Sequence, residues 1–141
     1  IPGAASSEDR KKGSAEVWPK YPGIKIVAQQ SGKYDRAVAL SVMENILQAQ
    51  PQVEAVFCFN DEMAMGALAA VKAAKRTGIK ITGMDANKDA RDSVANGELA
   101  MTVALPPYDI GKMGATHAKW LISKEKPVPP RTVMPVSFIT K

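Results

Sequence analysis

Short apolar runs rich in β-branched and aromatic residues alternate with longer helical patterns along this chain, and this alternation constrains its fold more than any other feature. Strands that alternate with helices are typical of βαβ units, so the pattern predicts an α/β fold built on an open parallel sheet. Five runs predict strands, namely Ile24–Gln29, Ala55–Phe59, Ile79–Gly83, Ala100–Ala104 and Thr132–Ile139.

Helical patterns lie between the predicted strands. They predict helices over Glu8–Val17, Asp35–Gln50, Glu62–Arg76, Asp89–Asn96 and Asp109–Lys124. Pro51 and Gly78 follow two of these helices, where proline cannot continue a helix and glycine accepts the left-handed conformation that often ends one. The chain opens with a predicted loop, Ile1–Ser7, and its first helix has no strand before it. We therefore expect the chain to be the later part of a longer polypeptide.

The composition is that of a folded globular domain. The chain has 141 residues, of which 45% are hydrophobic and 23% charged, which suits about one domain. Charged residues, proline or glycine interrupt every apolar run before it reaches the roughly 18 residues of a membrane span. The net charge is +5, but basic residues are interleaved with acidic ones and do not alternate with aromatics. This pattern favours solubility, and we expect no nucleic-acid partner.

Residue types that carry catalysis or bind metals are sparse. The single histidine, His117, falls on an apolar helical stripe, which favours packing over a catalytic or ligating role. Cys58 is the single cysteine and lies in an apolar strand, where we expect it to be buried and inert. The chain has no G-x-S-x-G motif, no zinc-binding spacing and no phosphate-binding P-loop. The sequence therefore predicts a protein that is not an enzyme and has no cofactor and no metal site.

Polar and aromatic residues follow the predicted strands at their carboxyl ends. Tyr34 comes after the first strand, Asn60 directly after the second and Asp85 shortly after the third. In an open parallel sheet, ligands bind outside these strand ends. Asn60 offers donors and an acceptor, an ionised Asp85 accepts, and Arg10, if close, donates from its guanidinium. Such a set suits the hydroxyl groups of a ligand.

Each of these residues also has a purely structural interpretation. Asn60, Asp61 and Asp85 lie where a helix begins, and N-caps are drawn from such residues. Tyr34 at a loop end is typical of rim packing. Arg10 stands in a charged run that fits a solvated helix face.

The sequence resembles the periplasmic ribose-binding-protein-like family, the type I solute-binding proteins of bacterial sugar ABC transporters. Among the matching segments, FNDEMAMGAL is specific to this superfamily, which also includes the effector domains of lactose-repressor-type regulators. The segments follow the family's order and spacing and are GAASSEDRKKG (Gly3–Gly13), KYDRA (Lys33–Ala37), VEAVFCFNDEMAMGALAAVKAA (Val53–Ala74), ITGMDAN (Ile81–Asn87) and LPPYDIGKMGA (Leu105–Ala115).

The resemblance implies a two-lobed clamp of which this chain supplies mainly the carboxy-terminal lobe, an open parallel sheet flanked by helices on both faces. Residues 1–105 would form this lobe, with its first strand outside the chain. Residues 106–131 would cross a hinge and place a helix on the amino-terminal lobe, and residues 132–141 would return as a strand. The amino-terminal lobe of the same protein is therefore an expected partner.

The resemblance also implies roles for individual residues. Arg10 matches a family position that donates to ring hydroxyls, Asn60 and Asp85 match positions that bind hydroxyl groups, and Tyr34 would cover the apolar face of the sugar. Tyr34 stands where phenylalanine is common, and Leu105 stands where the family commonly has a glutamine that contacts the sugar. A leucine makes no hydrogen bond, so we expect a ligand that is less polar on that side.

The leading hypothesis is a solute-binding protein that captures a monosaccharide or polyol between its lobes outside the cytoplasmic membrane and delivers it to the permease of an ABC transporter. The alternative is the effector-binding core of a sugar-responsive regulator of the lactose-repressor type, which shares the fold and the pocket. The segment before this lobe would discriminate them, since a regulator begins with a helix-turn-helix and a periplasmic protein with a signal peptide.

The helix expected to cross to the other lobe generates a prediction. Its apolar stripe would have no packing surface in this chain alone, so the isolated 141-residue chain should be marginally stable or associate through that helix. Thermal melts and sedimentation velocity over a dilution series measure both properties. A monomer with a sharply cooperative melt at high dilution would contradict this expectation.

Overall fold

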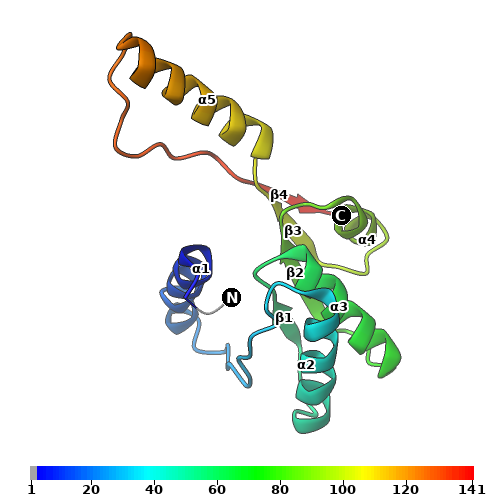
Figure 1. Cartoon of the computed structure of the whole chain (residues 1–141). Helices are drawn as coiled ribbons and strands as arrows, with labels where there is room; N and C mark the ends of the chain where they lie inside the picture. Colours follow the sequence, from blue (N-terminus) through cyan, green and yellow to red (C-terminus); the bar gives the residue numbers. More distant parts are fainter. Residues whose placement is uncertain (1–2) are drawn as a thin grey trace.

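A computed structural model describes residues 3–141, so Ile1 and Pro2 of the predicted opening loop lie outside the described residues. Within the described part, four strands form one sheet in the order β1-β2-β3-β4 (Figure 1). The first three strands pair in parallel, and β4 pairs antiparallel with β3. The strands are β1 (Ala55–Phe57), β2 (Lys80–Met84), β3 (Met101–Ala104) and β4 (Ser137–Thr140). The predicted α/β class with a mainly parallel open sheet is confirmed.

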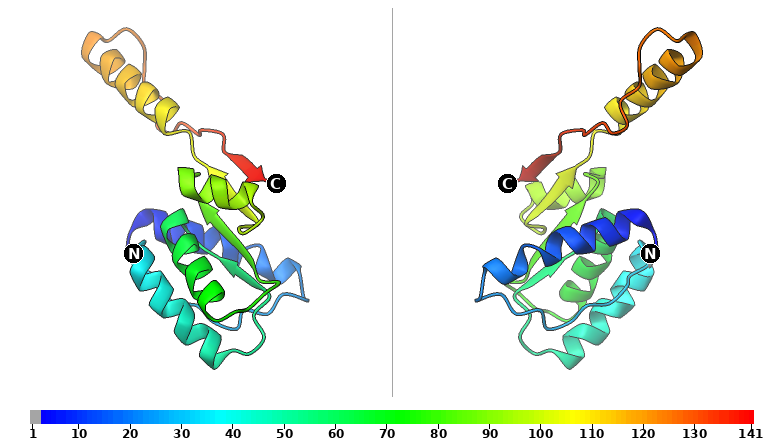
Figure 2. Two further views of the ribbon diagram at one scale, coloured as in Figure 1. Left: turned by 90° about the vertical axis from the view of Figure 1, so that its right-hand side faces the viewer. Right: turned by 90° about the vertical axis from the view of Figure 1, so that its left-hand side faces the viewer.

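Helices cover both faces of this sheet, as predicted. Helix α1 lies on one side, and α2, α3 and α4 lie on the other (Figures 1 and 2). The helices are α1 (Ala5–Ala15), α2 (Arg36–Ala49), α3 (Asp61–Ala73), α4 (Lys88–Ala95) and α5 (Pro107–Ser123), with a 3-10 turn at Trp18–Lys20. All five predicted helices are present, with ends that differ from the predicted ones by a few residues.

Side-chain caps fix where two of these helices begin. Asp35 caps α2, because its carboxylate accepts a hydrogen bond from the Val38 amide at 2.8 Å. Asn60 caps α3 in the same way, accepting from the Met63 amide at 2.9 Å. Each cap satisfies an amide that has no partner within its helix, which is why short polar residues are favoured there.

The hydrophobic core lies between the sheet and helices α2, α3 and α4. It gathers Met43 and Leu47 of α2, Val71 of α3, Ile81 of β2 and Val94 of α4. Cys58 is buried in the same core, and burial raises the pKa of its thiol to about 12. The predicted buried position of this cysteine is therefore confirmed.

Helices α2 and α3 approach each other so closely that one position between them has no room for a side chain. A Cβ atom added at Gly66 would overlap the carbonyl oxygen of Arg36 and meet the Leu40 amide nitrogen at 3.0 Å. Both obstacles are backbone atoms, which cannot rotate away. Gly66 therefore sets the distance between the two helices, and through α3 the position of α2 over the sheet.

The predicted strand Ile24–Gln29 is wrong. These residues form no strand, and Ile24, Ile26 and Val27 are each about half exposed. A β-type pattern gives a strand only where a neighbouring backbone supplies hydrogen bonds. Within residues 3–141, β1 stands at the edge of the sheet and this segment is not paired with it.

The predicted strand Thr132–Ile139 is confirmed only in part. Strand β4 begins at Ser137, and residues 131–136 form no strand. Pro135 lies in that unpaired stretch, where its missing N–H costs no ladder hydrogen bond. The strand also runs antiparallel to β3, so the sheet is mixed and not wholly parallel.

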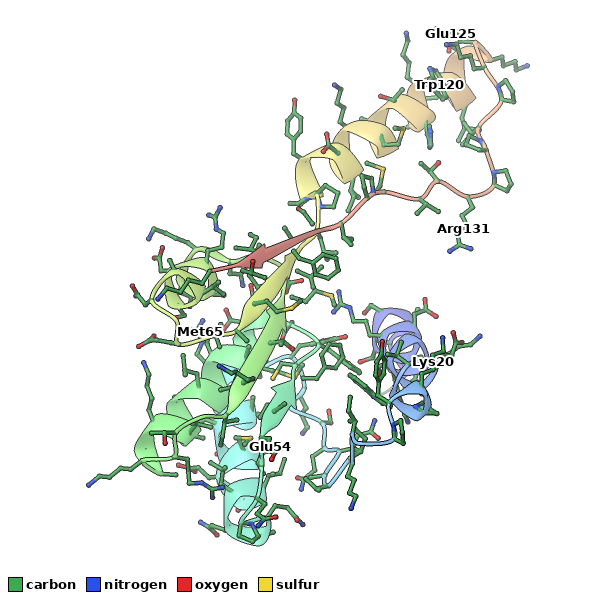
Figure 3. All side chains as sticks on the ribbon, turned by 180° about the vertical axis from the view of Figure 1, so that it is seen from behind. Lys20, Glu54, Met65, Trp120, Glu125 and Arg131 are labelled. Carbon is green, nitrogen blue, oxygen red and sulfur yellow. The ribbon has the colours of Figure 1, made fainter. Side chains whose placement is uncertain are left out.

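Helix α5 and the segment that returns from it extend away from the rest of the structure (Figures 1 and 2). None of the described residues of α5 is buried, and Tyr108 and Ile122 are 78% and 85% exposed. Figure 3 shows the α5 side chains, Trp120 among them, standing clear of the sheet. Among residues 3–141, every helix is too short or too polar to cross a bilayer. The predicted division of the chain near residue 105 stays a prediction.

The close contact of α2 and α3 predicts the effect of adding one methyl group. Gly66→Ala should lower the free energy of unfolding by about 1–3 kcal/mol, because the new Cβ forces the two backbones apart. Urea unfolding followed by circular dichroism measures this change. Gly13→Ala is the matched control, since a Cβ there meets no described atom within 4 Å and alanine favours a helix. Equal stability of the two variants would contradict the packing argument.

Candidate ligand-binding site

Asn60 stands at the carboxyl end of β1 and is 8% exposed. Its side-chain oxygen caps α3, so the structural interpretation of this residue is confirmed. Its amide nitrogen donates to the backbone oxygen of Tyr34 at 3.4 Å. The same side chain thus begins a helix and fixes the loop that carries Tyr34.

Tyr34 projects from a loop with an unusual backbone. Lys33 and Tyr34 both have positive φ angles, 53° and 57°, in the left-handed region. The Tyr34 hydroxyl accepts hydrogen bonds from Ser7 Oγ at 3.1 Å and Arg10 Nη1 at 3.4 Å. Burial raises the pKa of Tyr34, but the hydrogen bonds from serines 7 and 6 and the charge of Arg10 outweigh it, so the pKa is lowered overall.

Arg10 joins α1 to the end of β1. Its Nη1 donates to the backbone oxygen of Phe59 at 2.6 Å, and its guanidinium carbon lies 5.9 Å from the centre of the Tyr34 ring. The residue is half-buried, so it is not the solvated surface arginine of the structural interpretation. A guanidinium has further donors on Nε and Nη2 beyond those on Nη1.

Asp85 follows β2 in a strained conformation. Its φ angle is 117°, and that of Ala86 is 58°. Residues other than glycine adopt such angles only where the surroundings hold them, and these residues cluster at functional sites. The N-cap interpretation of Asp85 is wrong, because Asn87 stands at the N-cap of α4. Burial raises the pKa of the Asp85 carboxyl, the charge of Arg10 lowers it, and the net pKa is raised.

Leu105 follows β3 at the same edge of the sheet as Asp85. Met84 of β2 pairs with Val103 of β3, and the Asp85 amide donates to the Val103 carbonyl at 2.8 Å. Leu105 therefore stands beside the Asp85 loop, half-buried and without a polar side-chain atom. Its place leaves that side of the site apolar.

The structure thus brings the predicted site residues together in different ways. Direct contacts connect Arg10, Tyr34 and Asn60, an electrostatic interaction connects Arg10 with Asp85, and strand register places Leu105. None of these residues lines the two hollows of about 330 and 360 Å³, which lie between α2 and α3 and beside α5. The residues form an open face above the strand ends.

Three groups that hold the residues of this face were not predicted from the sequence. Ser7 holds the Tyr34 hydroxyl, and the carbonyl of Phe59 holds Arg10. Thr102 of β3 is fully buried and donates to Asp61 at 2.7 Å. A backbone carbonyl gives no signal in a sequence, and a serine in a helix or a threonine in a strand is too common to attract notice.

Comparisons with known proteins agree with this fold, which is that of one lobe of a ligand-binding protein. A family model described as periplasmic binding protein domain matches residues 1–126. The chain belongs to this family.

Relatives of known sequence cover most of the chain. The D-allose-binding periplasmic protein of Escherichia coli is 42% identical over 125 residues, 88% of this chain and 39% of that protein. The ribose import binding protein RbsB of Bacillus subtilis is 38% identical over 126 residues, 89% of this chain and 40% of that protein. The chain thus spans about two fifths of the length of these curated relatives.

Solved structures match the chain over nearly its whole length. An ABC transporter periplasmic solute binding protein from Actinobacillus succinogenes with bound D-allose has a TM-score of 0.94 and 33% identity, covering 99% of this chain and 50% of that one. The myo-inositol binding protein of Caulobacter has a TM-score of 0.87 and 32% identity, covering 99% of this chain and 48% of that one. These matches confirm the type I fold.

The interaction between Arg10 and Asp85 can be tested without a ligand. Arg10→Met should raise the pKa of Asp85, because the positive charge that favours the carboxylate is removed. Carbon-13 NMR titration of the aspartate carboxyls measures this pKa. Lys11→Met is the control, since it removes the same charge from an exposed neighbouring position on α1. An unchanged Asp85 pKa, or equal shifts in both variants, would contradict the placement of Arg10.

Proposed function

We propose that this chain is the carboxy-terminal lobe of a solute-binding protein that captures a monosaccharide or polyol and delivers it to an ABC transporter. The observation that carries the proposal is the convergence of Arg10, Tyr34, Asn60 and Asp85 on one edge of the sheet. Donors, an acceptor and an aromatic ring at one place match the surface of a sugar, which has polar edges and apolar faces.

Each residue has a part in this proposal. The guanidinium of Arg10 and the amide of Asn60 donate to sugar hydroxyls, and the carboxylate of Asp85 accepts from them. The ring of Tyr34 covers an apolar face of the sugar, and Leu105 faces a less polar part. A sugar that lacks a matched hydroxyl leaves a buried polar group unpaired, which costs roughly 1–3 kcal/mol. Selectivity follows from this cost.

The printed names of the relatives support a small polyhydroxylated ligand. They name D-allose, ribose, D-apiose and myo-inositol, which differ in ring and size and share closely spaced hydroxyl groups. Relatives of this kind are binding proteins, which agrees with a protein that performs no catalysis. These names favour the transport hypothesis over the regulator, which no observation supports.

The exposed helix α5 supports a second lobe as partner. Residues 1–105 form the ligand-binding lobe in this proposal, residues 106–131 place α5 on the amino-terminal lobe, and residues 132–141 return to the sheet, where Ser137–Thr140 form β4. The apolar side chains of Tyr108, Leu121 and Ile122 are largely exposed in this chain and would then be covered. The whole protein would act in the periplasm or outside the cytoplasmic membrane, with a membrane permease as its further partner.

A ligand screen tests the proposed function. The protein extended to its natural start should bind one of a panel of pentoses, hexoses, deoxy sugars and polyols, measured by thermal shift and calorimetry. Asp85→Ala should abolish that binding, since it removes the acceptor at the centre of the site.

Asp92→Ala is the matched control for that screen. Asp92 lies on the outer face of α4, paired with Lys88 at 2.6 Å and largely exposed, so its removal should leave sugar affinity unchanged. If the wild-type protein binds no member of the panel, the proposal of a sugar ligand is contradicted. Unchanged affinity of Asp85→Ala would remove Asp85 from the site.

A further inference from the structure

Asp61 has a fully buried carboxylate at the point where α3, β3 and the loop after β2 meet. It is 0% exposed. Its Oδ1 accepts from Thr102 Oγ1 at 2.7 Å, and its Oδ2 accepts from the Asn87 amide at 2.8 Å. Although Asp61 is the first residue of α3, these two bonds reach other elements, so the N-cap interpretation of this residue is wrong.

The surroundings of this carboxylate are built to admit it. A Cβ at position 83 would overlap Asp61 Oδ1, so glycine in β2 leaves the space that the carboxylate fills. Burial raises the pKa of Asp61 by more than the hydrogen bonds from Thr102 and from the loop amides lower it, so the pKa is raised overall. An apolar side chain would fill the same space without the cost of burying a charge. The carboxylate must therefore have a role that an apolar side chain could not fill.

That role is to hold the loop of residues 85–87. The backbone amides of these three residues all donate hydrogen bonds to neighbouring groups. The Asp85 amide donates to Val103 O at 2.8 Å, the Ala86 amide to Thr102 Oγ1 at 3.3 Å and the Asn87 amide to Asp61 Oδ2. Asp61 and Thr102 bind each other and supply two of these three acceptors.

These hydrogen bonds lie in a segment whose backbone conformation is energetically unfavourable. Asp85 and Ala86 have φ angles of 117° and 58°, which side chains disfavour. Such a conformation persists only where neighbouring groups hold it. The loop therefore depends on Asp61 and Thr102 for its shape, and the direction of the Asp85 carboxyl depends on the loop.

We propose that Asp61 is a positioning residue. It touches no ligand, and it strengthens ligand binding by holding the 85–87 loop, which places Asp85. This inference rests on the proposed function, because it assigns Asp85 to the sugar site. A loop held in advance loses less conformational freedom when the ligand binds, so the anchor strengthens binding from outside the site.

The test compares Asp61→Ala and Asp61→Asn in the protein extended to its natural start. Alanine removes both acceptors. Asparagine keeps an acceptor for the Asn87 amide, and its amide group donates to the Thr102 hydroxyl, which can accept. Sugar affinity should fall about tenfold or more in Asp61→Ala, because both buried hydrogen bonds are lost. It should fall by less than about threefold in Asp61→Asn, because both bonds can still form.

Amide hydrogen exchange without sugar gives the direct readout of the loop. Ala86 and Asn87 should exchange faster in Asp61→Ala and at nearly the wild-type rate in Asp61→Asn. Thr102→Val keeps the shape of the threonine side chain and removes its hydroxyl, so it should also accelerate exchange at Ala86. This second variant keeps the inference testable if Asp61→Ala fails to fold.

Ser93→Ala is the matched control. Ser93 is a buried polar residue of α4 that donates to Met65 Sδ at 3.6 Å, and its backbone oxygen accepts from the Glu98 and Leu99 amides, so these bonds reach other parts of the chain than residues 85–87. Its removal should change neither exchange at Ala86 and Asn87 nor sugar affinity. A loss of affinity in Ser93→Ala equal to that in Asp61→Ala would assign the effect to general destabilisation and overturn the inference.

A double-variant cycle shows whether Asp61 acts through Asp85. In an Asp85→Asn background, Asp61→Ala should weaken binding by less than about twofold, because the group it positions is already altered. The same factor in both backgrounds, or unchanged exchange at Ala86 and Asn87, overturns the inference. If no sugar binds the wild type, the proposed function fails and with it the effect on affinity, while faster exchange in Asp61→Ala still supports the anchoring of the loop.

Discussion

Parallel pairing of β1, β2 and β3 is the constraint on which the rest of this structure depends. Parallel strands bring their carboxyl ends to one edge of a sheet, so the residues that follow each strand become neighbours although they are far apart in sequence. Asn60 follows β1, Asp85 follows β2 and Leu105 follows β3. The crossover helices α3 and α4 make this pairing possible, and burial of α3 against the sheet holds it.

Two sets of polar contacts lie at this edge, one that holds Tyr34 and one that holds the loop of residues 85–87. Arg10 and Ser7 donate to the Tyr34 hydroxyl, Asn60 donates to its backbone oxygen, and all three donors are partly or largely buried. Asp61 and Thr102 are fully buried and accept hydrogen bonds from the Asn87 and Ala86 amides of the loop that follows Asp85. Both loops have positive φ angles in residues other than glycine. The loop before α2 and the loop after β2 are thus both strained, and partly buried hydrogen bonds hold them.

Some of the fold and site could be predicted from the sequence, and some could not. The helices with caps at Asp35 and Asn60 were predictable because a cap and an apolar stripe are local features. The strand Ile24–Gln29 was not, since a strand forms only beside another backbone and within residues 3–141 the sheet ends at β1. The antiparallel direction of β4 was also hidden, because the alternation of apolar residues is the same in both directions.

The sequence by itself determined the order and type of most elements, because hydrophobic periodicity, caps and the stop at Pro51 act within a few residues. The predicted stop at Gly78 is wrong, because α3 ends at Ala73 and Lys75 takes the left-handed conformation. It also marked Asn60 and Asp85 as residues that follow strands, whereas the strand predicted before Tyr34 does not form. Only the tertiary structure decided their partners. Arg10 binds a backbone oxygen 49 residues away, and Thr102 binds Asp61 across 41 residues. Contacts over such distances depend on how the sheet and helices pack, and local patterns carry no trace of them.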